Sequence, residues 1–154
     1  IHYVGGTLQL TTHQAIIENG VRKQVGLWLR QQADPSDRVH AEPIGYIGYY
    51  SGLFIQDWPG LVSPEVVKLR KKLGNDRRKV IAQLRPDWLV LRPSEVILVF
   101  GKSDLRDYYE RVKAFSALPE LEEKPWIPGR RYHYHDAKFM IFKKLRDSEK
   151  SVSE

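Results

Sequence analysis

The sequence predicts an α/β fold, a small three-layer sandwich whose central sheet is mostly parallel and Rossmann-like. Short apolar segments of strand length alternate with segments of helical periodicity, which is the order expected of a sheet covered by helices. The 154 residues, of which 42% are hydrophobic and 29% charged, suit one globular domain with its own core. Right-handed crossovers between the parallel strands follow from this arrangement.

The first long helix is expected from residue 11 or 12 to about residue 32. A threonine can cap its amino end, and the Asp34-Pro35 step ends it because proline disfavours a helical residue before it. An apolar stripe at helical spacing consists of Ile17, Val21, Val25, Trp28 and Leu29. Residues 1–10 are expected to form a linker or an edge strand.

The remaining elements follow from capping residues, periodicity and chain breakers. Ser63-Pro64-Glu65 is a strong helix start, with Ser as the cap, Pro in the first turn and an acid against the helix dipole. Strands are predicted over residues 38–44, 53–57, 88–91, 109–116 and 138–145. Helices are predicted over residues 63–74, 76–84, 93–100 and 103–108, with a tight turn or single helical turn over 45–52. Residues 117–131 are expected to be an ordered loop, and residues 146–154 a disordered tail after a single domain over 11–145.

The formal net charge of +6 is concentrated in one segment, residues 68–85. Six of its cations are candidate contacts for an anionic ligand or surface: Lys68, Lys71, Lys72, Arg77, Arg78 and Lys79. They could contact phosphates, anionic lipid headgroups or a pyrophosphate, but a helix face whose cations are simply solvated is the favoured interpretation. Nucleic acid is disfavoured, since aromatic residues are not interleaved with these cations as a stacking platform requires.

Composition excludes several kinds of chemistry. The absence of Cys rules out disulfides, thiolate zinc sites, Fe–S clusters and cysteine nucleophiles. The longest apolar run, residues 96–100, is far shorter than the ~20 residues of a membrane helix. The chain begins at Ile1 and its only methionine is Met140, so we expect it to be a piece of a longer protein.

Two motifs have spacings that argue against a cofactor or a metal. Gly45-x-x-Gly48-x-x-x-Gly52 follows a strand, but no long helix comes after it and no acid lies ~20 residues on, so a tight turn beneath packed tyrosines is favoured over a dinucleotide loop. His133-x-His135 with Asp136 could offer metal ligands from one face of a strand, but no partner motif accompanies it. We therefore expect no cofactor and no metal.

Two carboxylates stand at the carboxyl ends of the first two predicted strands, where open α/β sheets bind ligands. Glu42 and Asp57 can form a general acid/base pair, which would make the chain a small hydrolase or transferase. The alternative is that both carboxylates accept hydrogen bonds from backbone amides of the adjoining loops.

Three segments together resemble a known family. They are Glu42-Pro43-Ile44-Gly45-Tyr46-Ile47-Gly48-Tyr49-Tyr50-Ser51, then Asp57 with Gly60-Leu61-Val62-Ser63-Pro64-Glu65, and finally Arg85-Pro86-Asp87-Trp88-Leu89-Val90. The pattern resembles the C-terminal soluble region of polytopic membrane glycosyltransferases, the dolichyl-phosphate-mannose protein mannosyltransferases and their bacterial relatives. The resemblance covers roughly residues 21–90.

The resemblance implies a parent protein that moves a sugar from a polyprenyl-phosphate donor to an acceptor on the extracytoplasmic side of a membrane. In that family the catalytic carboxylates lie between membrane helices that this chain does not contain, so no catalytic residue is carried over. The resemblance further implies a noncatalytic, membrane-tethered, extracytoplasmic (periplasmic) domain that helps to place an acceptor or partner. Its expected partners are the membrane-embedded part of its own chain, anionic lipid headgroups or a glycan acceptor. The motif residues Glu42, Tyr49, Tyr50 and Asp57 are candidates for a cleft at the strand ends.

One further class of function stays open beside the enzyme and the membrane domain. The chain can be an independent binding module that holds an anionic ligand or nucleic acid through the basic segment 68–85.

Overall fold

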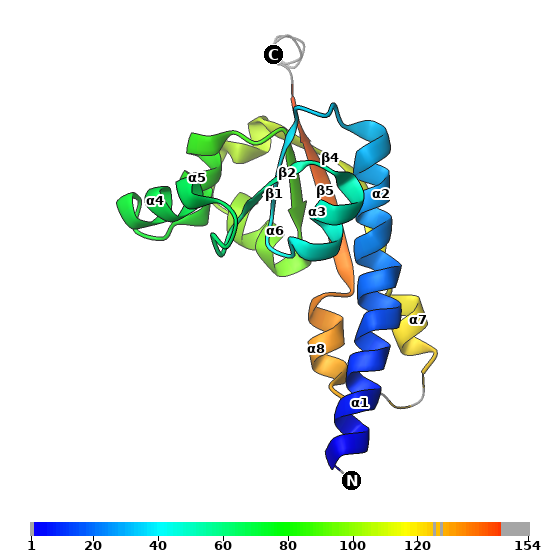
Figure 1. The fold of residues 1–154 in the computed structure, drawn as a ribbon. Coiled ribbons are helices and arrows are strands. Elements are labelled where there is room, and N and C mark those ends of the chain that lie inside the picture. The colour runs from blue at the N-terminus through cyan, green and yellow to red at the C-terminus, as the bar shows by residue number, and fades with distance from the viewer. Residues whose placement is uncertain (1, 125, 127, 146–154) are drawn as a thin grey trace.

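The computed structural model describes residues 2–124, 126 and 128–145, which form a five-stranded sheet with helices on both faces (Figure 1). This confirms the α/β class. The strands are β1 (Arg38–Ala41), β2 (Phe54–Asp57), β3 (Trp88–Leu91), β4 (Tyr109–Ser116) and β5 (Lys138–Lys144). The helices before β3 are α1 (His2–Thr12), the π-helical η1 (His13–Arg22), α2 (Lys23–Gln32), α3 (Gly45–Ser51), α4 (Pro64–Lys72) and α5 (Arg77–Leu84). Those after β3 are α6 (Pro93–Phe100), the 3-10 helix η2 (Asp104–Asp107), α7 (Leu118–Glu122) and α8 (Arg130–His135).

The sheet is mixed, which corrects the expectation of a mostly parallel, Rossmann-like sheet. Its strand order is β2-β1-β3-β5-β4, and β1 pairs in parallel with both β2 and β3. Strand β5 runs antiparallel to both of its neighbours, β3 and β4. The connection through α7 and α8 begins where β4 ends and brings the chain back to the same end of the sheet. Strand β5 therefore starts beside the end of β4 and runs in the opposite direction.

Two apolar clusters fill the two sides of the sheet. On one side η1, α2 and α3 pack on the strands, and the predicted stripe residues Ile17, Val21, Val25 and Leu29 are all buried there. On the other side α5 and α6 supply Ile81, Val99 and Phe100 to a second cluster. All four residues of β3 are buried. Its run of consecutive apolar residues predicts this, because such a run is typical of a strand covered on both faces.

The amino-terminal residues form a helix, which corrects the expected linker or edge strand over residues 1–10 for the described part of that range. Thr12 does not begin a new helix, because its backbone is helical and its side chain makes no cap hydrogen bond, so α1 runs directly into η1 and η1 into α2. The helix α1 extends beyond the carboxyl edge of the parallel strands, and α7 and α8 lie on either side of it (Figure 1). No helix in the described part of the chain is both long and apolar enough to cross a membrane.

The helices α7 and α8 occupy positions for which we expected a loop and a strand. A helix is possible within segment 117–131 although the segment contains prolines. Pro119 lies in the first turn of α7, where the missing amide hydrogen is tolerated. The tail, residues 146–154, lies outside the described residues.

Candidate functional site at the carboxyl edge of the parallel strands

The carboxyl ends of β1 and β3 flank the point where the chain changes direction across the sheet. From β1 the chain passes through α3 to β2 on one side, and from β2 it returns through α4 and α5 to β3 on the other side of β1. Such a switch point is where open α/β sheets hold ligands. Glu42 follows β1, Asp57 ends β2 and Arg92 follows β3, so all three lie along this edge.

Asp57 organises the loop between β2 and α4. Its carboxylate accepts hydrogen bonds from the backbone amides of Leu61 at 2.5 Å and Val62 at 3.1 Å. Burial opposes ionisation, but these two amide hydrogen bonds, helped by the Ser63 side chain, outweigh it, so the pKa of Asp57 lies below its ordinary value. The carboxylate is committed to holding the backbone, which agrees with the alternative reading of this residue as a loop anchor.

Ser63 takes part in the same loop through its hydroxyl. It stands at the predicted cap position of α4, but its side chain makes no cap hydrogen bond. Its Oγ instead accepts from the backbone amide of Asp57 at 3.0 Å and donates to the Ile55 carbonyl at 2.9 Å. The loop that presents Leu61 and Val62 to solvent is therefore fixed from both ends.

Arg92 gathers three carboxylates around its guanidinium. Its Nε lies 2.5 Å from Asp136, and its Nη1 lies 3.1 Å from Glu95 and 3.2 Å from Glu42. The Arg92 side chain is only 6% exposed, whereas that of Glu42 is 37% exposed. Desolvation disfavours the charged guanidinium, but Asp136 and Glu95 outweigh it and raise the pKa of Arg92.

The cluster extends in two directions from Arg92. Toward α5, Arg77 lies 2.6 Å from Glu95 and donates from Nε to the His40 imidazole at 3.1 Å. Toward η1, Arg22 lies 2.6 Å from Asp136 and also pairs with Glu18. This carboxyl-edge cluster therefore ties η1, β1, α5, α6 and the end of α8 together through ion pairs and the Arg77–His40 hydrogen bond.

Burial also controls the protonation of the cluster. Desolvation opposes ionisation of Glu95, but Arg77 and the backbone amide of Arg92 outweigh it and lower the pKa of Glu95. Desolvation, followed by the charge of Arg77, lowers the pKa of His40 from 6.5 to about 3. At neutral pH the Glu95 carboxylate is thus ionised and the His40 imidazole is neutral.

The structure separates the residues predicted for a strand-end cleft. Glu42 belongs to the carboxyl-edge cluster, and Asp57 is buried under its own loop. Tyr49 on α3 is 81% exposed, and its ring makes an edge contact with Tyr50 at 5.1 Å. Glu42 and Asp57 are thus each engaged with a different partner.

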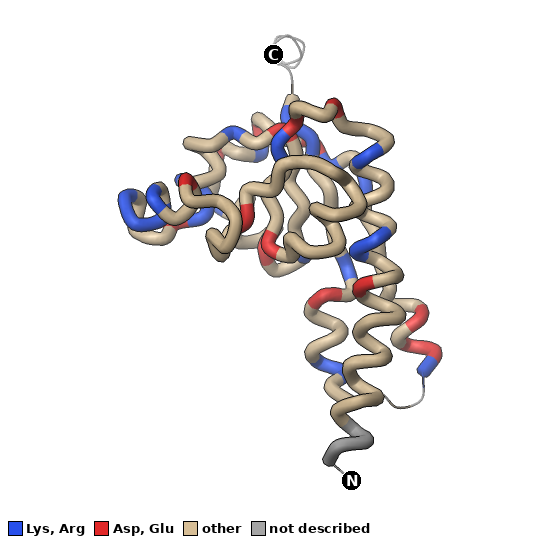
Figure 2. The backbone as a smooth tube through the Cα atoms, viewed as in Figure 1, with Lys and Arg blue, Asp and Glu red and all other residues tan. Residues whose placement is uncertain are grey.

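The predicted anionic-surface residues are divided in a similar way. Lys68, Lys71, Lys72 and Lys79 are exposed on α4 and α5, where Figure 2 shows the basic residues gathered. Arg78 pairs with Asp76 at 3.0 Å and is half-buried. Arg77 is 4% exposed and bound to Glu95, so its guanidinium is not available to an anionic surface, which corrects its inclusion in that set.

The histidine motif lies on α8 and not on a strand. His133 is buried against His13, with Nδ1 atoms 3.4 Å apart, while His135 is exposed. Among the described residues no group of three His, Cys, Asp or Glu side chains is arranged to hold a metal ion.

Sequence reasoning missed most members of the carboxyl-edge cluster, although one signal was present. Glu95 stands three residues after Arg92 and accepts a hydrogen bond from its backbone amide at 2.6 Å, as in a capping box. Arg22 and Asp136 are 114 residues apart in the chain, and no local pattern links them.

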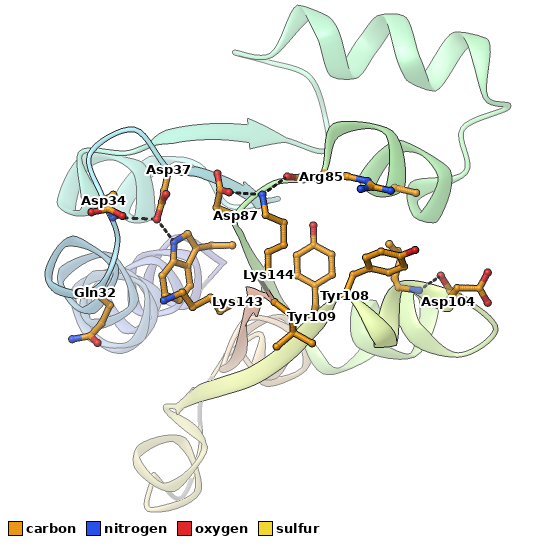
Figure 3. Close-up of a pocket in the computed structure, with 15 residues that line it drawn as sticks. Gln32, Asp34, Asp37, Arg85, Asp87, Asp104, Tyr108, Tyr109, Lys143 and Lys144 are labelled. Atoms are coloured by element: carbon orange, nitrogen blue, oxygen red, sulfur yellow. Dashed lines mark hydrogen bonds and ion pairs between the residues drawn. The ribbon is translucent and has the colours of Figure 1, made fainter. Parts of the chain in front are cut away.

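A cavity of about 690 Å³ lies at the opposite, amino edge of β1 and β3 (Figure 3). Its walls come from the loop before β1, the end of α5, η2, and the adjoining ends of β3, β4 and β5. Asp37 in this wall accepts a hydrogen bond from the Trp88 indole at 2.8 Å, and Asp87 pairs with Lys144 at 2.6 Å. None of the individually named candidate residues lines it, although Arg85, the last residue of the basic segment 68–85, does.

Comparison with known proteins identifies one family. The family described as "Domain of unknown function (DUF8728)" matches residues 12–142. No curated protein and no solved structure matches the chain.

Proposed function

The chain belongs to this family of domains of unknown function (DUF8728), and we propose that it is a noncatalytic, extracytoplasmic domain of a membrane glycosyltransferase. Its parent uses a polyprenyl-phosphate sugar donor, and the domain assists the placement of an acceptor or a partner. The proposal rests on the resemblance of residues 21–90 to the soluble region of such enzymes.

The proposal of a noncatalytic role is supported by the interactions that the carboxylates make at the carboxyl edge. Glu42 is paired with Arg92, and Asp57 is held by two backbone amides. General acid/base chemistry needs a carboxyl group whose pKa lies near the working pH, and the hydrogen bonds of Asp57 move its pKa in the opposite direction. The edge is therefore better suited to a rigid support than to proton transfer.

The motif residues of the resemblance support the same role, because they build the frame of the domain. The glycine-spaced stretch forms α3, and Gly26 of α2 allows α3 to approach so closely that an added Cβ would lie 2.8 Å from the Tyr50 Cβ. The second stretch forms the loop anchored by Asp57 and Ser63. A framework role explains why these residues occur together without forming one catalytic cleft.

The direction in which α1 extends supports attachment of the domain to a membrane through this end of the molecule. This helix extends past the carboxyl edge (Figure 1), and its Leu8 and Leu10 are exposed. We assign this end of the molecule to the membrane-embedded part of the same protein, which is the partner proposed for it.

Cell fractionation tests the proposal. An antibody raised against the chain is used to measure the mass of the reactive protein and its sedimentation with membranes after a high-salt wash. We expect a membrane-integral protein much heavier than 18.0 kDa, with its epitope protected from protease in intact cells and exposed in spheroplasts. A soluble protein near 18.0 kDa would overturn the proposal.

A second candidate function is an independent module for an anionic ligand, and the exposure of Lys68, Lys71, Lys72 and Lys79 favours it. Reversing the charge of Lys71 and Lys72 should abolish co-sedimentation with phosphatidylglycerol vesicles, whereas reversing Lys113 on β4 should leave it intact. Equal binding by both variants would sink this candidate.

A further inference from the structure

Two imidazoles that the proposed function does not use meet where α8 runs beside the amino-terminal helical segment (Figure 1). His13 begins η1, and His133 lies within α8, 120 residues further along the chain. Their Nδ1 atoms are 3.4 Å apart, and the two rings are stacked with their centres 5.5 Å apart. His133 is fully buried, and the His13 side chain is 12% exposed. The pair is therefore a shielded contact between two elements that are distant in the sequence.

The hydrogen bonds around the pair define where its protons lie. The Nε2 atom of His133 is 3.2 Å from the Pro128 carbonyl oxygen, which can only accept, so this nitrogen carries a hydrogen. While the His133 ring is neutral its Nδ1 atom is an acceptor, and the facing Nδ1 of His13 donates to it. The Nε2 atom of His13 lies 3.4 Å from a carboxylate oxygen of Glu18. A protonated His13 beside a neutral His133 satisfies all of these contacts.

The groups around the pair favour one positive charge and oppose a second. On η1, Glu18 faces His13 and also pairs with Arg22. On α8, the phenol ring of Tyr132 lies 5.0 Å from the ring of His13. Burial, followed by the charge of His13, lowers the pKa of His133. A second proton is therefore unfavourable as long as the two imidazoles stay in contact.

We infer that His13 and His133 form an acid-sensitive latch between η1 and α8. A proton added to His133 would occupy its Nδ1 and place two N–H groups against each other across 3.4 Å, with a positive charge on each ring. The hydrogen bond is then lost and the rings repel one another, so the beginning of α8 separates from η1. The carboxyl end of α8 stays in place, because Asp136 remains bound to Arg22 and Arg92.

The latch opens in acid and stays closed in base. Loss of a proton from His13 at higher pH leaves its Nδ1–H and the acceptor on His133 in place, so the contact persists. In acid the open form takes up the second proton more readily than the closed form. The opening equilibrium should therefore rise about tenfold for each pH unit below about 6.5, the ordinary pKa of a histidine, until the pH reaches the lowered pKa of His133.

Hydrogen exchange and NMR of the histidine rings test the latch in the full chain. The backbone amides of Tyr132 and His133 donate to the Gly129 carbonyl at 2.8 and 3.3 Å. A helix of six residues does not persist in water without packing, so the exchange of these amides reports the release of α8 from η1. After correction for the intrinsic pH dependence of exchange, it should accelerate about tenfold between about pH 6.5 and pH 5.5. At neutral pH the ring nitrogens of His133 should report a neutral imidazole with its hydrogen on Nε2.

Two glutamine variants with a matched control isolate the latch. In His133→Gln the amide can still accept from His13 and donate to the Pro128 carbonyl, but it takes up no proton, so the acid-induced acceleration should vanish. His13→Gln removes the facing charge and should have the same effect, and it keeps the latch testable if His133→Gln fails to fold. His135→Gln changes an exposed histidine of the same helix and should leave the acceleration intact.

Three results would overturn the inference. They are exchange in α8 that follows only its intrinsic pH dependence, an acceleration that both latch variants retain in full, and a His133 ring with its hydrogen on Nδ1 at neutral pH. Membrane attachment does not enter these measurements. A latch in a soluble 18.0 kDa protein would refute only the proposed function, and a membrane glycosyltransferase whose α8 does not respond to acid would refute only the latch.

Discussion

Arg92 is the residue on which the carboxyl-edge cluster depends, because Glu42, Glu95 and Asp136 all pair with it. Two of these carboxylates are buried, and buried ions remain stable only while their partners are present. The stability of the cluster should therefore depend on the Arg92 side chain.

Replacing Arg92 with Met should lower the free energy of unfolding by about 3–5 kcal/mol, since the buried carboxylates of Glu95 and Asp136 each lose one of their two cations. The measurement is urea unfolding at neutral pH, and the control is Arg111→Met on the exposed face of β4. If both variants unfold at the same urea concentration, Arg92 does not hold the cluster together.

His40 gives the fold a defined response to acid. The folded chain keeps it neutral to about pH 3, whereas the unfolded chain takes up a proton near pH 6.5. Stability should therefore fall as the pH is lowered through this window, by up to about 1.4 kcal/mol per pH unit from this residue.

His40→Gln should flatten the loss of stability between about pH 6.5 and pH 4.5. Glutamine retains an acceptor for the Arg77 Nε, so the neutral fold keeps its hydrogen bond. Urea unfolding at several pH values measures the slope, with the exposed His135→Gln as a control. The pKa of His133 is also lowered, by burial and then by His13, so part of the slope should remain.

At the scale of elements, the contact between α2 and α3 is decided by one glycine. A Cβ at position 26 would lie 2.8 Å from the Tyr50 Cβ and 3.0 Å from the Ile47 carbonyl oxygen. Both neighbours belong to a packed helix and cannot move independently.

Gly26→Ala should therefore destabilise the fold by about 1–3 kcal/mol, although alanine is the better helix former. Thermal unfolding measures the effect. Gly6→Ala in α1 is the matched control, since no atom lies within 4 Å of its added Cβ, and it should be neutral or stabilising. A stabilised Gly26→Ala would mean that α3 does not pack closely on α2.

At the scale of the whole molecule, α1 lies outside the packed body. The buried apolar residues on this helical segment begin at Ile16, and the matched family region begins at residue 12. The first helix is thus an extension of the domain and not a part of its core.

Removing residues 1–11 should leave the free energy of unfolding within about 1 kcal/mol of the full chain, because little apolar surface is lost from the core. Circular dichroism should show less helix with a nearly unchanged melting temperature. A loss of cooperative unfolding would show instead that α1 supports the body. The close approach of Gln9 to Gly129 is one contact that this truncation removes.

The sequence by itself determined the α/β class, most element positions and the buried stripe of η1 and α2. These depend on local signals: periodicity, caps and prolines act within a few residues of each other. Strand β3 was predicted with the bounds that the structure shows, and the helix predicted over 76–84 is α5, whose cap residue Asp76 accepts from the Arg78 amide at 3.0 Å.

Only the tertiary structure decided the direction of β5, the helical state of α1 and α8, and the partners of the charged residues. Strand direction depends on where a connection returns, and a pattern of alternating residues is the same in both directions. The sequence predicts Arg77 to be a surface cation. In the structure it is a buried member of the carboxyl-edge cluster, because α5 packs over His40. Ion pairs and cavities are made by residues far apart in the chain, so their existence is settled only when the elements pack.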